Sequence, residues 1–249
     1  MTTRYHIGAR RLESNLAAYA KRFDFLEVHM PARGQPAPTL ATLRRWRKQV
    51  PPHFDFSVVV GPAASELKAG KDLDADLDAA MAAADALQAR CMLIATPAQV
   101  TPAHAWRDRL AKVAERLKRD ATLVAWEARG LWEADDARRL ASKLGIVLVV
   151  DPLRDPVPDG AVSYTRLRAL GETRSFGVSA LERVVVAIGS RRDAYVVIET
   201  QSALAECKRL RQLTQGRPKA TGGMGRVIRP RDAAPAMAAA LRVKDDEQE

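Results

Sequence analysis

The chain is poor in the residues that build disulfide and metal frameworks. It holds two cysteines and four histidines among 249 residues. Cys91 and Cys207 fall on apolar positions of separate predicted elements, where buried free thiols are commoner than disulfides. The sequence contains no HExxH, no CxxC and no Ser/His/Asp or Cys/His motif. These absences argue against a disulfide-stapled secreted domain and indicate a reducing, cytoplasmic location.

Long hydrophobic runs are also missing. Apolar stretches such as Ile146–Val150 are far shorter than the roughly 20 residues that a membrane-crossing helix needs. No apolar signal-peptide core precedes the first patterned stretch, Tyr5–Ala9. Since no Ser/Gly-rich linker divides the chain and 47% of it is hydrophobic, we expect one large core and no membrane partner. The sequence leaves the oligomeric state open.

Positive charge is abundant, with a formal net charge of +10 at pH 7. Much of it lies on predicted helix faces, for example Arg44 and Arg45 or Arg107 and Arg109. Such a balance favours anionic partners and supports nonspecific binding of nucleic acid. A solvated outer face is the alternative interpretation.

Eight short apolar segments alternate with helical patterns along the chain, and each of them predicts a strand. They are Tyr5–Ala9, Phe25–His29, Phe54–Val60, Cys91–Ala95, Leu123–Glu127, Ile146–Asp151, Val162–Leu167 and Tyr195–Glu199. Eight near-continuously apolar strands in about 250 residues predict a TIM-type (β/α)8 barrel, and an open doubly wound sheet is the alternative. The segment Pro152–Gly160 is too short for a helical crossover, so we expect the helix after the sixth strand to be missing.

The expected boundaries are a barrel over residues 1–215 and a C-terminal segment over 216–249. This segment combines a Gly/Arg-rich loop, a short helix and a charged tail. Such a loop can cradle phosphate through backbone N–H groups, although it lacks the Lys and Ser/Thr of a P-loop. Within the barrel, Thr39, Thr101 and the pair Ser179 and Glu182 predict helix N-caps.

Polar side chains gather where the predicted strands end. In such barrels the site lies at the C-terminal ends of the strands, and side chains two apart point the same way. Arginines held beside acids suit binding of phosphate or carboxylate groups. We therefore expect a site for a small anionic or phosphorylated ligand. Its predicted ligand-binding residues are His29, Arg129, Asp151, Tyr164, Arg166, Arg168 and Glu199.

Glu27 and Glu127 are the candidate catalytic residues of the same strand ends. Two carboxylates flanking a bond can act as acid and base, as in glycoside hydrolysis, so a hydrolase-like activity stays open. A metal would draw on His29, while His6, His53 and His104 are expected in the barrel interior, a loop and a helix. One imidazole is too few for a typical cluster, and we expect neither a metal nor a cofactor. A purely structural salt-bridge network is the other interpretation.

Several strand-end motifs resemble those of the YecE-like proteins, known as domain of unknown function 72. The similar segments follow the family's order along most of the chain. They are Ile7-Gly8, Leu26-Glu27-Val28-His29, Phe56-Ser57-Val58-Val59, Glu127-Ala128-Arg129-Gly130 before Trp132, and Tyr164-Thr165-Arg166-Leu167-Arg168-Ala169. The resemblance implies a TIM-barrel-like fold and a pocket of unestablished activity. By carry-over, the pocket residues are Glu27, Glu127, Arg129, Tyr164 and Arg166.

The departures from this pattern remove groups that transfer protons near neutral pH. The family's lysine is Val59 here, its two histidines are Gly130 and Arg168, and its asparagine on the second strand is His29. The asparagine pair after the last strand reads Glu199 and Thr200. The resemblance therefore implies a divergent and possibly non-catalytic member. Nucleic-acid hydrolysis of the endonuclease-IV type needs a His-rich metal cluster that this chain lacks.

Three functional hypotheses follow. The first is a barrel that binds a small anionic ligand at its mouth. The second is a nucleic-acid-binding protein that uses its basic surface. The third is a scaffold or partner-binding protein in which the charged mouth residues only hold the barrel shut.

Overall fold

A computed structural model describes residues 2–9, 12, 15–32, 34–119, 122–168 and 175–215. The segment 216–249, predicted to hold a Gly/Arg-rich loop, a short helix and a charged tail, lies outside the described residues. Within the described ranges, every helix is too short or too polar to cross a bilayer.

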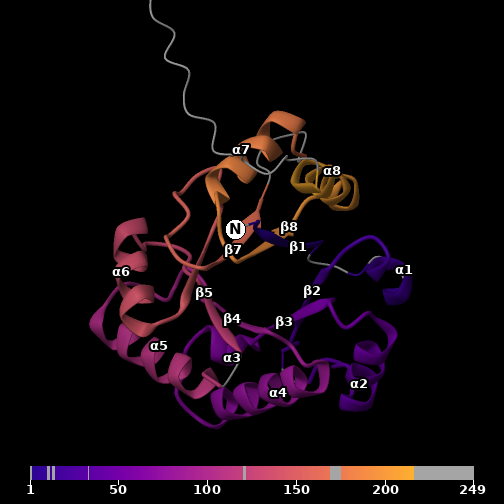
Figure 1. The fold of residues 1–249 in the computed structure, drawn as a ribbon. Coiled ribbons are helices and arrows are strands. Elements are labelled where there is room, and N and C mark those ends of the chain that lie inside the picture. Colours follow the sequence, from indigo (N-terminus) through magenta and orange to yellow (C-terminus); the bar gives the residue numbers. More distant parts are fainter. Residues whose placement is uncertain are drawn as a thin grey trace, which may run out of the picture. The chain divides into compact units, whose positions relative to one another are not determined.

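Eight parallel strands form the inner ring of the described barrel (Figure 1). Their order in the sheet is β1-β8-β7-β6-β5-β4-β3-β2, so sequence neighbours pair throughout except at β1 and β2, and β1 pairs with β8. This arrangement confirms the TIM-type barrel and excludes the open doubly wound sheet. The strands are β1 (Arg4–Ala9), β2 (Phe25–His29), β3 (Asp55–Val59), β4 (Cys91–Ala95), β5 (Leu123–Glu127), β6 (Val147–Val150), β7 (Val162–Leu167) and β8 (Asp193–Ile198).

Helices surround this ring (Figure 1). They are α1 (Leu16–Ala20), α2 (Leu40–Gln49), α3 (Pro62–Ser65), α4 (Lys71–Leu87), α5 (His104–Leu117), α6 (Ala134–Leu144), α7 (Val178–Ile188) and α8 (Ala203–Gln215). Their apolar stripes pack on the outward side chains of the strands, which gives a continuous outer layer of core. No helix joins β6 to β7 within the fully described stretch 151–161, as the short connection predicted.

Arg191 holds the β6–β7 connection in place where a crossover helix is missing. Its guanidinium group donates to the carbonyls of Pro158 at 2.7 Å, Gly160 at 3.1 Å and Ile188 at 2.6 Å. Ile188 is the last residue of α7, so this cation also faces the negative end of a helix. Arg191 is buried, and backbone carbonyls take the place that a carboxylate would have beside its guanidinium group among the described residues.

The ring closes between β1 and β2, where the described residues form no strand ladder. The hydroxyl of Tyr19 bridges the two strands: it accepts from the N–H of Ala9 at 2.8 Å and donates to the carbonyl of Phe25 at 2.9 Å. The backbones approach so closely here that a Cβ on Gly8 would lie 2.1 Å from the Phe25 oxygen. Glycine is therefore required on β1 at the closure.

The interior of the ring is layered. At its N-terminal end, His6 lies between Asp55, at 3.1 Å, and Asp193, at 3.2 Å. This position confirms the predicted location of His6 in the barrel interior. Above it, Tyr195 stacks on Tyr164 with ring centroids 5.7 Å apart. The aromatic layer separates the lower ionic cluster from the C-terminal mouth of the barrel.

Two of the predicted N-caps are wrong. Thr39 accepts a hydrogen bond from the N–H of Thr42 at 3.2 Å and caps α2 as expected. In contrast, α5 begins at His104 after Ala103, and α7 begins at Val178 after Gly177, so neither Thr101 nor Ser179 is the capping residue. Helix stability in proteins comes mostly from tertiary packing, so a capping motif in the sequence does not by itself decide where a helix begins.

Candidate functional site

The mouth of the barrel brings together most of the predicted site residues, from the C-terminal ends of β2, β5, β7 and β8. Three glutamates and three arginines form one contiguous ion network there. Its members are Glu27, Glu127, Glu199, Arg129, Arg166 and Arg168. The formal charges of these six groups balance, which is the condition for burying them at tolerable cost.

Arg166 is the centre of the network and is only 1% exposed. It forms a fork with Glu27, with Nε 3.1 Å from Oε1 and Nη2 2.6 Å from Oε2. Its Nη1 donates to Oε2 of Glu127 at 2.7 Å, and its Nε lies 3.5 Å from Oε1 of Glu199. One guanidinium group thus connects acids from three strands, and it is withdrawn from solvent.

Glu27 has further partners below and beside this fork. The hydroxyl of Tyr164 donates to Oε1 of Glu27 and lies 3.3 Å from the hydroxyl of Ser57. His29, two residues along β2, places Nε2 3.4 Å from Oε2 of Glu27, too poorly aligned for a hydrogen bond. Ser57 was not predicted as a site residue, although it stands beside Glu27 in the β2–β3 register.

Arg168 and Arg129 form the outer rim of the network, with side chains 35% and 42% exposed. Arg168 holds Glu199 by a fork, with both contacts at 3.1 Å, and pairs with Oε1 of Glu127. Arg129 donates one hydrogen bond, at 2.9 Å, to Oε2 of Glu127. Both partly exposed guanidinium groups are therefore anchored on the same carboxylate, and each has further N–H donors that bond to no described residue and can meet an incoming group.

Asp151 lies at the edge of this arrangement. Its Oδ1 accepts the N–H of Leu153 at 3.0 Å, and its Oδ2 lies 3.5 Å from the backbone N–H of Arg168 and 3.7 Å from Arg154. It shapes the turn after β6 and contacts the network through backbone alone.

The network fixes the protonation of its acids. Burial alone raises the pKa of Glu27, but the charge of Arg166 and the nearby His29 outweigh burial and hold that pKa at about 2. Burial also opposes ionisation of Glu127, and Arg166 and Arg168 hold its pKa at about 2. Burial lowers the pKa of Arg166, yet the two glutamates raise it above its usual value. All three groups are charged at neutral pH.

This charge state limits the chemistry that the mouth can perform. A general acid must carry a proton at working pH, and a carboxyl group with a pKa of about 2 does not. The pKa of Tyr164 is raised by burial and by Glu27, so its hydroxyl stays protonated. Among the described residues, no group of three His, Cys, Asp or Glu side chains has the arrangement of a metal site.

Glu206 on α8 is a buried carboxylate that sequence reasoning missed. Its Oε1 accepts the backbone N–H of Phe176 at 2.5 Å, and its Oε2 is bound by the hydroxyl of Thr200. Loops after the seventh and eighth strands often bind phosphate in (β/α)8 barrels. Here Glu206 already occupies one such N–H group. The sequence did offer one signal for its burial. Glu206 lies three residues after Ala203 and next to Cys207, on the apolar face of α8.

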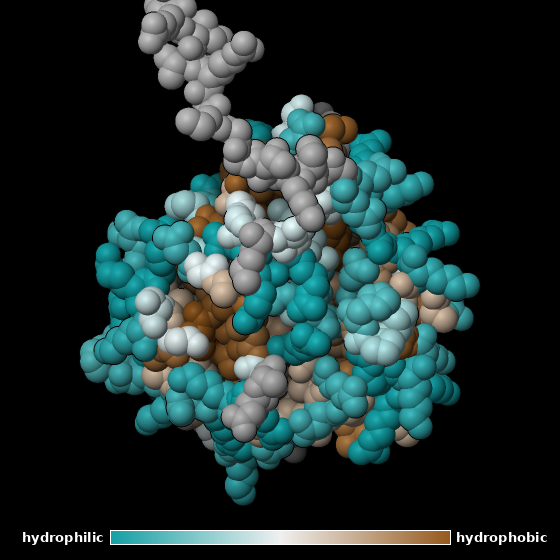
Figure 2. Space-filling model, in the orientation of Figure 1, coloured by the Kyte–Doolittle hydropathy of each residue, from teal (hydrophilic) through white to brown (hydrophobic). Residues whose placement is uncertain are grey.

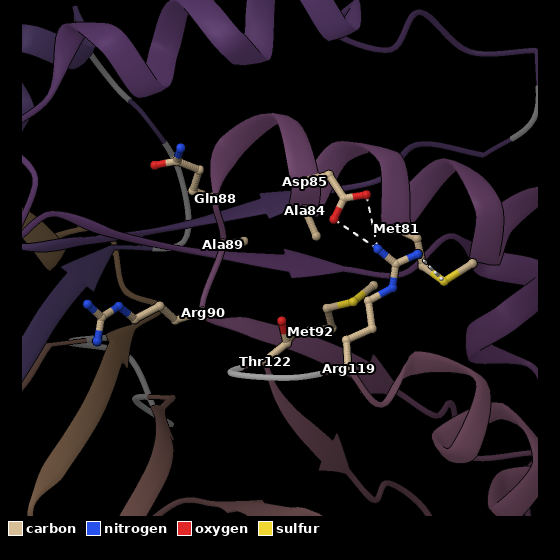
Figure 3. Close-up of a pocket in the computed structure, with 9 residues that line it drawn as sticks. All are labelled: Met81, Ala84, Asp85, Gln88, Ala89, Arg90, Met92, Arg119 and Thr122. Carbon is tan, nitrogen blue, oxygen red and sulfur yellow. Dashed lines mark hydrogen bonds and ion pairs between the residues drawn. The ribbon is translucent and has the colours of Figure 1, made fainter.

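The described residues also line hollows. One, of about 370 Å³, lies beside the network at the end of β2, where Glu27 and His29 line it together with Leu12, Pro38 and Trp46. Another, of about 530 Å³, lies at the opposite end of the barrel, before β4 and β5 (Figure 3). In Figure 3, Arg119 points at Asp85 and Met81, and its Nη1 lies 2.9 Å from Oδ1 of Asp85. Arg119, a cation that lines this hollow, is therefore already paired with an acid. We place the candidate site at the mouth.

Solved structures of low identity share this fold. A DUF72 family protein of Enterococcus faecalis V583 superposes with a TM-score of 0.68 at 15% identity, covering 85% of this chain and 96% of its own. A DUF72 family protein of Thermotoga maritima MSB8 gives 0.64 at 16%, with coverages of 85% and 99%. An AP endonuclease, family 2, from Brucella melitensis gives 0.54 at 14%, with coverages of 80% and 93%. At these identities the likeness concerns the fold.

Two further comparisons address the sequence itself. No curated protein matches the chain. A family model described as "Protein of unknown function DUF72" matches residues 2–232 of the 249. The match covers every strand and helix of the barrel, and it agrees with the motif resemblance at the strand ends. The chain therefore belongs to the DUF72 family of proteins of unknown function.

Proposed function

We propose that the mouth of the barrel binds a small anionic ligand, one that carries a phosphate or a carboxylate group. The observation that supports this proposal is the pair Arg129 and Arg168, two partly exposed guanidinium groups anchored on the single carboxylate of Glu127. A doubly anchored pair loses little side-chain entropy on binding, and its planar donors match an oxyanion.

Arg166 serves this site as a positioning residue. It is buried and makes its contacts with glutamates, so it orients Glu27 and Glu127 and, through Glu127, both rim arginines. The direct anion contacts of the proposal are therefore Arg129 and Arg168, while Glu199 fixes the plane of Arg168.

Binding without acid–base chemistry fits the ionised state of Glu27 and Glu127 better than hydrolysis does. The chain also lacks the family's lysine and histidines at the corresponding positions, where it has Val59, Gly130 and Arg168. We propose a binding role for this chain, in a reducing cytoplasm where Cys91 and Cys207, both free and buried, stay reduced.

Calorimetric titration with inorganic phosphate and with acetate tests the proposal. Arg129→Ala removes a rim donor whose loss leaves Glu127 paired with Arg166 and Arg168. Each charge-assisted hydrogen bond is worth about 1.5–3 kcal/mol, so phosphate affinity should fall at least about tenfold. Arg154→Ala is the matched control, because this arginine lies on the same side of the barrel and, among the described residues, its ion pair is with Asp151, outside the network.

Arg168→Lys supplies a second measurement. It keeps the positive charge and removes the planar fork on Glu199, so it should weaken phosphate binding while preserving the folded far-ultraviolet spectrum. Equal phosphate affinity in wild type and Arg129→Ala would refute the proposal. Failure of both anions to bind wild type would favour the purely structural network.

A further inference from the structure

We infer that the outer face formed by α2, α8 and the turn after α1 binds the phosphate backbone of nucleic acid. Seven exposed basic side chains lie on these neighbouring elements, and we call them the basic sector. They are Lys21, Arg22, Arg44, Arg45, Lys48, Lys208 and Arg209. The sector belongs to the helical layer of the barrel and is separate from the ion network at the mouth.

The three elements of the basic sector are neighbours in space. α1 packs against α2, and α8 packs on β1, the strand that precedes α1. Arg211 of α8 reaches the turn after α1, where it donates to the carbonyl of Arg22 and, at 3.2 Å, to Asp24. In Figure 1 the three helices follow one another along one side of the barrel, and the same side is predominantly hydrophilic in Figure 2.

The charges of the basic sector are not neutralised within the described residues. None of its seven side chains makes an ion pair there. Residues 16–24, 40–49 and 203–215 contain two acids, and both are engaged elsewhere: Asp24 pairs with Arg211, and Glu206 is buried. The sector therefore carries a local excess of positive charge.

On the other side of the barrel several basic residues are paired with acids, although Arg109, Lys112 and Lys143 make no ion pair with a described acid. Arg116 of α5 pairs with Asp74 and Asp78 of α4, and Arg119 pairs with Asp85. On α6, Arg138 and Arg139 pair with acids of that helix's own first turn, Asp135 and Asp136. Of the fourteen described lysine and arginine side chains that make no ion pair with a described acid, seven lie in the basic sector.

The composition of the sector favours a polyphosphate partner over a membrane. Leu40 is the one large exposed hydrophobic residue on α1, α2 or α8 among those described, and a helix that inserts into a bilayer surface needs a wider apolar face. Four of the seven basic residues are arginines, whose forked donors match phosphate oxygens. Binding through such contacts ignores base sequence and weakens steeply with salt.

Fluorescence anisotropy with the full 249-residue chain tests this inference. The probes are a labelled DNA duplex and a labelled single-stranded RNA, both of mixed sequence. The triple variant Arg44→Ala, Arg45→Ala, Lys48→Ala removes three charges from the basic sector. If each contacts one phosphate, the slope of log affinity against log salt should become shallower by about 2.7 on the duplex.

The matched control removes the same charge from ion-paired side chains, by Arg116→Ala, Arg138→Ala and Arg139→Ala on α5 and α6. This control should keep most of the wild-type affinity and slope, and circular dichroism should show both variants folded. Absence of wild-type binding to both probes at about 50 mM salt would overturn the inference. It would also be overturned by an equal loss in the two triple variants, or by polyglutamate or anionic phosphatidylglycerol vesicles binding as tightly as the duplex.

Discussion

Arg166→Met removes the guanidinium group at the centre of the mouth network and keeps a side chain of similar length. The acids it serves then lose their principal counter-charge while they remain buried, Glu27 most completely. Breaking a buried ion pair by removing one partner costs about 3–5 kcal/mol. We expect a loss of this size in the free energy of unfolding at pH 7.

The pH dependence gives an independent magnitude. The difference between the usual glutamate pKa of 4.5 and about 2 corresponds to about 3 kcal/mol for Glu27. Because the folded pKa is lowered, this stabilisation is present above about pH 4.5 and is lost as pH falls towards 2. In Arg166→Met, burial raises the pKa of Glu27 instead, so the carboxyl takes up a proton more readily in the folded than in the unfolded state.

The two proteins should therefore converge as the solution is acidified. The destabilisation by Arg166→Met should be largest at pH 7 and shrink towards pH 4, where Glu27 becomes neutral in the variant. Urea unfolding followed by circular dichroism at several pH values measures it. Arg168→Met is the control, with a smaller effect expected because solvent reaches this side chain. A destabilisation below about 1 kcal/mol, or one that is independent of pH, would refute the reasoning.

Two further predictions concern the closure of the barrel and its missing helix. Tyr19→Phe removes the hydroxyl that joins Ala9 to Phe25 and leaves a buried N–H group without a partner, so the free energy of unfolding should fall by about 1–3 kcal/mol in urea titrations; an unchanged midpoint would show that the bridge is dispensable. Arg191→Ala should expose the β6–β7 connection to limited proteolysis near Pro158 while the ring persists; cleavage at the wild-type rate would contradict the anchoring role of Arg191.

Most of the fold could be predicted from the pattern of apolar residues along the chain. The eight strands and the missing crossover could be predicted because buried parallel strands are near-continuously apolar and because a connection as short as 151–161 excludes a helical crossover. The meeting of Glu27, Glu127 and Arg166 also followed, since alternation places strand-end residues on one rim. The helix starts at Thr101 and Ser179 were predicted wrongly, because packing overrides a local cap signal.

Other features had no local signal. Nothing in the sequence indicates that Arg166 is buried. Arg168, two residues later and just after β7, is partly exposed to solvent. That difference depends on which carboxylates arrive from β2 and β8, and on how deeply each lies. Tyr19 and Arg191 are similar cases, because their partners are backbone groups, which every residue possesses.

The Tyr19 bridge has a consequence for how the ring comes apart. Everywhere else the ring is held by main-chain ladders, but here it depends on one phenol, a close backbone approach and a single 3.3 Å hydrogen bond from the Asp24 N–H to the Ile7 carbonyl. Transient separation costs least at such a junction, so amide protons of Ala9 and its neighbours should exchange with deuterium before those of β7 or β8. In that opening, β1 and β8 would move away from β2 together, because β1 is paired with β8 along its whole length.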